Sequence, residues 1–198
     1  QVLNQSGLCV PDGMPLVWLL KQAKFKNSGR VFGPDWMLAL CDALGRQDRS
    51  VFYYGGNLGV ADELAETIAT SFPGIQSSGT ICPPFRDLTA EEKSEYVSIM
   101  NAANPDVIWV GLSTPKQERW MAEFRPLLNA RVLIGVGAAF DYNTGRLRRA
   151  PEWIQNCGLE WLFRLILEPR RLWRRYLRNN PLFLFFLFLE RTGLRKFD

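Results

Sequence analysis

The chain has 198 residues, 47% hydrophobic and 22% charged, which is the length and composition of one soluble domain with a small appendage. It contains no histidine, which excludes histidine general bases, Ser-His-Asp and Cys-His nucleophile pairs, and histidine-based zinc sites. The four cysteines are scattered without a C-x-x-C pair, so we expect reduced, buried thiols and no zinc or thioredoxin-type motif.

The charge is distributed unevenly along the chain. Residues 1–145 hold 12 basic and 15 acidic side chains, whereas residues 146–198 hold 12 basic and 5 acidic ones. The basic last quarter also carries Trp153, Trp161, Trp173 and a Phe-rich stretch at 182–189. This combination favours a phosphate-bearing ligand or an anionic membrane surface, and the net acidic remainder argues against nucleic acid. No run reaches the roughly 20 apolar residues of a spanning helix, and no signal peptide is evident.

Short apolar runs alternate with helical patterns through the first three quarters of the chain. Strands are predicted at 30–33, 51–54, 75–81, 107–110 and 132–136, and helices at 35–45, 58–72, 89–103 and 115–128. Thr89 and Glu92 have the spacing of a helix capping box. The alternation predicts a Rossmann-like, mostly parallel α/β sheet flanked by helices, which forms a domain over residues 1–150.

From residue 151 onward the pattern is helical only, which predicts an all-helical, basic appendage over residues 151–198. Pro169 and Pro181 are expected to divide it into helices at 151–168, 169–180 and 181–190. The spacing of Arg164, Arg171 and Arg174 aligns them on one side of these helices. An exposed basic face is the simpler interpretation, but the interleaved tryptophans favour an amphipathic element that lies on a membrane.

Open parallel sheets bind ligands beyond the carboxyl ends of their strands, so the turns after the strands are candidate sites. The amides of Gly55 and Gly56 could face a phosphate group, although such a turn can be purely structural. Lys116 and Gln117 follow the strand at 107–110, in a polar turn that could also be only a solvated helix start.

Two further turns carry carboxylates. Asp12 precedes an apolar helix, and Asp141 follows the strand at 132–136. The simpler interpretation of each is a helix N-cap. There is no D-x-D motif, so a nucleotide diphosphate would find no such carboxylate pair to hold Mg²⁺. Its charge would then need amides, helix dipoles and arginines.

Several strings between residues 10 and 180 are specific enough to indicate a family. They are DG at 12–13, RVFGPD at 30–35, GG at 55–56, PKQE at 115–118, GVGAAFD at 135–141, RAP at 149–151, GLEW at 158–161 and EPRR at 168–171. In these strings and their order the chain resembles the WecG/TagA/CpsF family of bacterial glycosyltransferases. Ser113 departs from the family pattern, which usually has Gly at that position.

The resemblance implies an inverting, metal-independent glycosyltransferase with no cofactor. It would move an N-acetylmannosamine-type sugar from a UDP-sugar to a polyprenyl-diphosphate-linked sugar, in bacterial surface polysaccharide or teichoic acid synthesis. The implied location is cytoplasmic, peripheral on the inner face of the cell membrane. Family members carry a further segment before the DG string, which implies that this chain is a fragment or a shortened member. A homo-oligomer is compatible with the sequence.

The resemblance also implies roles for single residues. Asp12 would be the catalytic base, because a chain without histidine needs a carboxylate for that task. The nucleotide-sugar contacts would come from Gly55, Gly56, Lys116, Gln117 and, near the uridine, Asp141. Three tail residues would close over the site and hold the leaving UDP or the acceptor diphosphate, namely Arg164, Arg171 and Arg174.

Two other classes of function compete with this interpretation. A nucleotide-dependent oxidoreductase could use the same sheet, but the chain lacks the G-x-G-x-x-G motif. A catalytically impaired or fragmentary family member could instead act as a membrane-peripheral nucleotide- or lipid-binding module.

Overall fold

The computed structural model of the chain describes residues 2–195, so the last three residues of the predicted appendage, 196–198, lie outside the described residues. The chain folds as two compact units, residues 1–149 and residues 150–198. The first unit contains all the strands of the described residues, and the second is helical.

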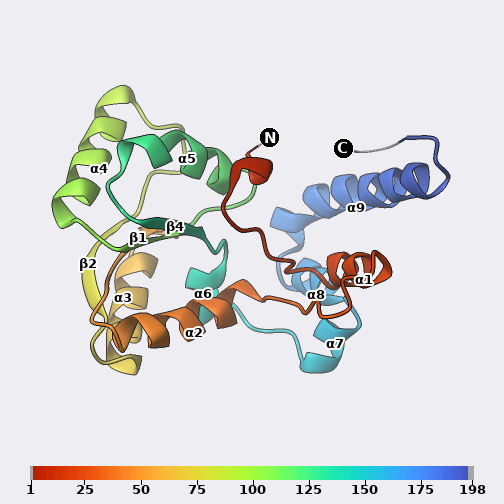
Figure 1. Cartoon of the computed structure of the whole chain (residues 1–198), viewed down its shortest axis with the longest axis horizontal. Helices are drawn as coiled ribbons and strands as arrows, with labels where there is room; N and C mark the ends of the chain where they lie inside the picture. Colours follow the sequence, from red (N-terminus) through yellow and green to blue (C-terminus); the bar gives the residue numbers. More distant parts are fainter. Residues whose placement is uncertain (1, 196–198) are drawn as a thin grey trace. The chain divides into compact units, whose positions relative to one another are not determined.

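A four-stranded parallel sheet forms the centre of the first unit (Figure 1). Its order is β2-β1-β3-β4, with β1 (Ser50–Gly55), β2 (Gln76–Ile81), β3 (Val107–Gly111) and β4 (Val132–Gly135). From β1 the chain moves outward to β2, and then crosses back past β1 to β3. The strand order therefore reverses between β1 and β3, and the predicted α/β class is confirmed.

Helices cover both faces of this sheet (Figure 1). One face carries α2 (Gly33–Gly45), α3 (Val60–Ser71) and α6 (Ala139–Asn143), and the other carries α4 (Ala90–Ala103) and α5 (Lys116–Phe124). A short 3-10 turn, η2 (Arg125–Leu127), continues α5, whereas η1 (Leu3–Gln5) and α1 (Met14–Gln22) precede the sheet. The predicted capping box is present, because Thr89 Oγ1 accepts from the Glu92 amide and Glu92 Oε2 accepts from the Thr89 amide.

The double cover explains why the strands are apolar runs rather than alternating patterns. Successive residues of β1 enter two different cores: Tyr53 packs with α2, α3 and α6, whereas Tyr54 packs with α4 and α5. In the second core Tyr54 stacks on Trp120 with ring centroids 4.2 Å apart, and Trp120 stacks on Phe124 at 4.4 Å.

At the amino ends of the strands, the polar side chains form hydrogen bonds and ion pairs with one another. Asp106 accepts hydrogen bonds from the Ser50 amide at 3.1 Å and the Ser50 hydroxyl at 3.3 Å. Its carboxylate also lies 3.5 Å from the Arg49 guanidinium and 3.3 Å from that of Arg131. These contacts, the Ser50 amide first, lower the pKa of Asp106.

Two local predictions in the first unit are wrong. Residues 30–33 form no strand. Their one backbone hydrogen bond to another extended segment runs from the Val31 amide to the Pro11 carbonyl. Helix α2 already begins at Gly33, with Pro34 in its first turn. The four cysteines are free, but only Cys41 is buried, and this burial raises the pKa of its thiol to about 12. Cys82 is half-buried, and Cys9 and Cys157 are exposed in loops.

The second unit consists of α7 (Glu152–Asn156), α8 (Glu160–Leu167) and α9 (Pro169–Arg191). Its predicted helical character and the predicted break at Pro169, where α9 begins, are confirmed, but the other breaks differ. Gly158, with φ of +71°, separates α7 from α8, whereas α9 continues through Pro181. Proline has no amide hydrogen, so Pro181 cannot donate to the carbonyl of Leu177, four residues earlier. Leu177 is an exposed residue. Among residues 2–195, no helix is both long enough and apolar enough to cross a membrane.

Candidate functional site

The carboxyl ends of β1 and β3 meet where the strand order reverses, the position at which open α/β sheets bind ligands. Gly55 pairs with Gly111 in register, and the Gly56 amide donates to the Gly111 carbonyl at 3.0 Å. A Cβ atom on Gly55 would lie 2.5 Å from that carbonyl oxygen, and both Gly55 and Gly56 have positive φ. The two backbones can approach this closely only because these positions are glycine.

The turn after β4 joins the same edge through α6. Phe140 packs under the glycines: a Cβ atom on Gly111 would lie 2.8 Å from its ring, and one on Gly56 would lie 3.4 Å away. Asp141 follows Phe140 within α6, whose N-cap is Ala138, so Asp141 does not cap that helix. The turns after β1, β3 and β4 therefore converge on one edge of the sheet, as the strand-end rule predicts.

Gln117 connects two of these turns. Among the described residues it is the one buried polar or charged side chain, with 7% of its surface exposed. Its Oε1 accepts from the Gly137 amide at 2.8 Å, and a Cβ atom on Gly135 would overlap its amide group. Gln117 thus fixes the turn between β4 and α6 against the first turn of α5. Sequence reasoning assigned Gln117 to the donor sugar, and the structure adds a positioning contact.

A cavity of about 590 Å³ opens at this edge, between α4 and α5. Its cationic residues are Arg86, Lys93, Lys116 and Arg119, its acidic residues are Asp87 and Glu123, and its apolar wall includes Tyr54, Leu88, Leu112 and Trp120. The volume lies within the usual range for small-molecule sites. The sequence analysis missed this cavity and Arg119, although Lys116 and Arg119 have the three-residue spacing of neighbours on one helix face.

Two of the four cations are already neutralised. Arg86 donates two hydrogen bonds to Glu92, at 2.7 and 2.6 Å. These bonds, together with the hydrogen bond that Glu92 accepts from the Thr89 amide, lower the pKa of Glu92 to about 2. Lys93 Nζ lies 2.5 Å from Glu123 Oε1. Lys116 donates only to the Arg86 carbonyl at 3.3 Å, and within residues 2–195 neither Lys116 nor Arg119 forms an ion pair. The cavity therefore has cationic groups to offer an anionic ligand.

Asp12 lies just before α1 but does not cap it, because the N-cap is Gly13 and no side chain bonds to the helix amides. Arg30 Nε donates to the Asp12 carbonyl at 2.7 Å, and Arg30 Nη2 lies 3.3 Å from Asp12 Oδ1. The Asp12 side chain remains 60% exposed. The structure thus removes the simpler N-cap interpretation for both Asp12 and Asp141 and leaves an accessible carboxylate held by an arginine.

The segment after Arg30 links Asp12 to α6. The Arg30 guanidinium lies 4.6 Å from the centre of the Phe32 ring, which packs edge-on against Tyr142 at 5.4 Å. Arg149 lies 5.4 Å from the same ring and forms an ion pair of 2.5 Å with Asp35. Arg30, Phe32, Asp35 and Arg149 lie in the family strings quoted above, to which no role was assigned, and the structure shows that Arg30 contacts both Asp12 and the Phe32 ring.

The three predicted tail residues belong to the second unit. Arg171 pairs with Glu168 at 2.7 Å, Arg174 lies 5.1 Å from the Trp173 ring, and Arg164 is half-buried in α8. That these arginines close over the sheet edge stays a prediction. In the part of the chain that the structure describes, no three cysteine or acidic side chains cluster to hold a metal ion.

Comparison with known proteins supplies the family. The model of the "Glycosyl transferase WecG/TagA/CpsF family" matches residues 1–197. Two curated relatives carry the name N-acetylglucosaminyldiphosphoundecaprenol N-acetyl-beta-D-mannosaminyltransferase: one from Bacillus subtilis (strain 168), 31% identical, and one from Bacillus spizizenii (strain ATCC 23059 / NRRL B-14472 / W23), 32% identical. Each alignment spans 176 residues, which is 89% of this chain and 66% of the relative.

The contact between Gln117 and Gly137 predicts a stability effect. Replacing Gln117 with Ala leaves the Gly137 amide without its acceptor, so we expect the free energy of unfolding to fall by about 1–3 kcal/mol. Urea unfolding followed by circular dichroism measures this, with Gln47→Ala, at an exposed position after α2, as the matched control. Equal unfolding midpoints for the two variants would show that the hydrogen bond does not hold the turn.

Proposed function

The chain belongs to the WecG/TagA/CpsF family of glycosyltransferases, and from this premise we propose that it transfers an N-acetylmannosamine-type sugar from UDP to a polyprenyl-diphosphate-linked sugar. The observation that carries the proposal is the convergence of the turns after β1, β3 and β4 at the reversal of strand order, beside a cationic cavity. The reaction would serve bacterial surface polysaccharide or teichoic acid synthesis.

The donor would bind at this edge of the sheet. Gly55 and Gly56 would leave room for phosphate oxygens to approach the backbone of the turn after β1, beyond the Gly56 amide that is bonded to Gly111. Lys116 and Arg119 in the adjacent cavity would supply positive charge. Gln117 would orient the sugar, and Asp141 would approach the uridine. Because amides and cations carry the diphosphate charge, no metal ion is required.

Asp12 would act as the general base of a single displacement. Its carboxylate takes the proton from the acceptor hydroxyl while that oxygen forms a bond to the anomeric carbon of the donor sugar. The bond from that carbon to UDP breaks at the same time, UDP leaves with the electron pair, and the configuration inverts. Arg30 would hold Asp12 in place through the backbone and side-chain contacts described above.

The second unit would bring the enzyme to its lipid substrate. Arg164, Arg171 and Arg174 would hold the departing UDP or the acceptor diphosphate, and the exposed Trp153, Trp161 and Trp173 would enter the interface of an anionic membrane. The protein would thus be peripheral on the inner face of the cell membrane, at the cytoplasmic side where nucleotide sugars are made.

UDP should bind without a metal ion. We expect isothermal titration calorimetry in EDTA to show UDP binding as tight as with Mg²⁺ or Mn²⁺. Lys116→Gln should weaken it about tenfold, the usual effect of losing one charge-assisted hydrogen bond. Arg131→Gln, an exposed change at the opposite edge of the sheet, should leave it unchanged. A titration that needs a divalent cation would overturn the metal-free donor site.

Replacing Asp12 with Asn should separate binding from catalysis. We expect UDP affinity to stay nearly unchanged and turnover of the UDP-sugar with a short-chain lipid acceptor to fall about 10²–10⁴-fold. Asp42→Asn, which removes an exposed carboxylate on α2, is the matched control. If Asp12→Asn keeps most of its kcat, Asp12 is not the base. If the unsubstituted chain binds UDP or lipid but turns nothing over, the non-enzymatic binding module is the better description.

The tail should contribute electrostatically to membrane binding. Each cation near an anionic leaflet contributes about 1 kcal/mol, so Arg171→Gln with Arg174→Gln should lower binding to anionic liposomes about tenfold or more. Turnover of a membrane-embedded acceptor should fall with it. Arg46→Gln with Arg131→Gln, both exposed in the first unit, provides the control. Undiminished flotation and turnover of the tail variant would leave the second unit a purely structural role.

A further inference from the structure

The turn after α1 concentrates positive charge in the otherwise acidic first unit. Residues 13–34 contain Lys21, Lys24, Lys26 and Arg30 and no acidic residue, whereas residues 1–145 as a whole carry three more acidic than basic side chains. Between residues 2 and 195, none of the three lysines forms an ion pair. Their charges are therefore available to a partner.

The backbone of this turn presents Phe25 between two of the lysines. The Phe25 amide donates to the Leu20 carbonyl and the Lys24 amide to the Lys21 carbonyl, the two hydrogen bonds of a Schellman helix ending. Lys24 occupies its left-handed position, with φ of +72°, where glycine is the favoured residue. Glycine at this position would make the helix ending more stable than lysine does, so the lysine is not explained by the helix ending alone.

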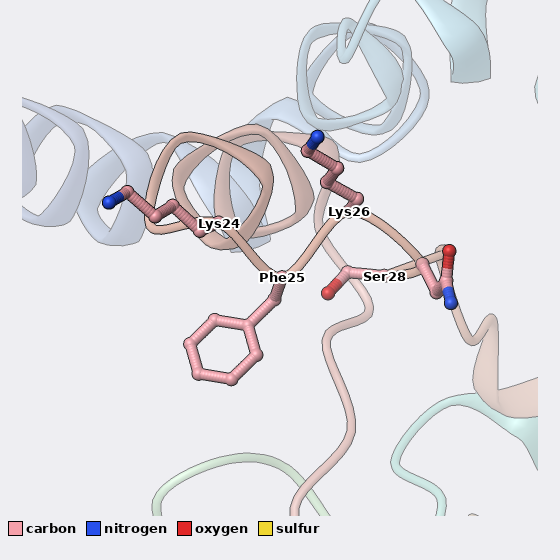
Figure 2. Close-up of a pocket in the computed structure, with 5 residues that line it drawn as sticks. Lys24, Phe25, Lys26 and Ser28 are labelled. Atoms are coloured by element: carbon pink, nitrogen blue, oxygen red, sulfur yellow. The ribbon is translucent and has the colours of Figure 1, made fainter.

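The side chains of the turn face solvent. Figure 2 shows the Phe25 ring standing away from the ribbon, with the amino groups of Lys24 and Lys26 on other sides of the turn. Phe25 is 63% exposed, and Lys21, Lys24 and Lys26 are exposed as well. Lys24, Phe25 and Lys26, with Asn27 and Ser28, line an open hollow of about 490 Å³. An exposed phenylalanine flanked by unpaired lysines suits the interface of a bilayer, which accepts apolar and cationic groups together.

We propose that residues 21–28 form a membrane contact of the first unit, in which Phe25 enters the acyl boundary and Lys21, Lys24 and Lys26 bind the phosphates of anionic lipids. Charge complementarity favours this partner. The three lysines form no ion pair within residues 2–195, so an anionic surface would neutralise their charges, whereas a neutral protein surface would not. The residues of this contact belong to the first unit, whereas those of the proposed tail contact belong to the second.

The position of the turn connects the membrane to the candidate base. Helix α1 begins two residues after Asp12 and, with nine residues, is about 13 Å long. The chain then returns to Arg30, whose guanidinium contacts Asp12. The ends of the segment 13–29 are therefore held together by the Asp12–Arg30 pair. A bilayer bound at the far end of α1 would hold Asp12 close to the headgroups, where a lipid-linked sugar is found. This purpose rests on the proposed function, but membrane binding itself does not.

Vesicle co-sedimentation of the full chain tests the contact. We expect binding to phosphatidylcholine vesicles that contain phosphatidylglycerol and little binding to phosphatidylcholine alone. Lys24→Gln with Lys26→Gln should lower the partition coefficient about tenfold or more, and Phe25→Ser should lower it severalfold. The matched controls are Arg46→Gln with Arg131→Gln for charge and Leu127→Ser for an exposed apolar residue, and neither should change binding.

Lys24→Gly separates the membrane role from a structural one. Glycine suits the left-handed position, so this variant should unfold at an equal or higher urea concentration than the unsubstituted chain while its vesicle binding falls about fivefold. Unchanged vesicle binding in the double lysine variant, or equal binding to neutral vesicles, would overturn the proposal. So would a Phe25→Ser variant that keeps vesicle binding but loses self-association, because the turn would then contact a second copy of the chain.

The outcome is independent of the enzymatic proposal. If the turn binds membranes, its variants should keep their turnover of a water-soluble short-chain acceptor and lose it only with the acceptor in vesicles. If no acceptor is turned over at all, the glycosyltransferase proposal fails while the vesicle measurement still decides the membrane contact. Combining the lysine variant with Arg171→Gln and Arg174→Gln should lower the partition coefficient further than either change alone, because each removes different cations from the membrane contact.

Discussion

The candidate site depends on a backbone approach that only glycine allows. At the ends of β1 and β3 the chains come so close that a side chain on Gly55 would overlap the Gly111 carbonyl. A methyl group at either position would push the two strand ends apart or displace Phe140. The edge therefore exposes backbone, rather than side chains, at the reversal of strand order. Phe140 fills the space beneath, and Gln117 ties in the third turn.

The two edges of the sheet handle polarity in opposite ways. At the amino ends of the strands, the Asp106 carboxylate is surrounded by the Ser50 amide and hydroxyl and by two arginines, so its hydrogen-bonding capacity is used within the protein. At the carboxyl ends, Lys116 and Arg119 lack acidic partners among residues 2–195. The second edge is the one at which open α/β sheets bind ligands.

Sequence periodicity was sufficient for the sheet, because strands covered on both faces are short apolar runs that loops rarely imitate. It also predicted that the turns after the strands meet at one edge of the sheet, since the strand-end rule requires only the order of strands and turns. It failed at residues 30–33, where an apolar run resembles a strand but finds no neighbouring strand to pair with. It also failed at Pro181, because proline usually ends a helix but α9 continues through it. The Gln117 contact and the cavity each bring together residues that are far apart in the sequence. Local sequence patterns therefore could not predict them.

The cysteines give each folded unit its own chemical handle. Cys9 is exposed in the first unit and Cys157 in the second, whereas Cys41 is buried and burial raises the pKa of the Cys82 thiol. Alkylation proceeds through the thiolate, so a maleimide at neutral pH should prefer the two exposed positions. The native chain can thus carry a donor and an acceptor dye, or two nitroxides, without engineered residues. Energy transfer or dipolar spectroscopy between them would follow the two units in solution as UDP or vesicles are added.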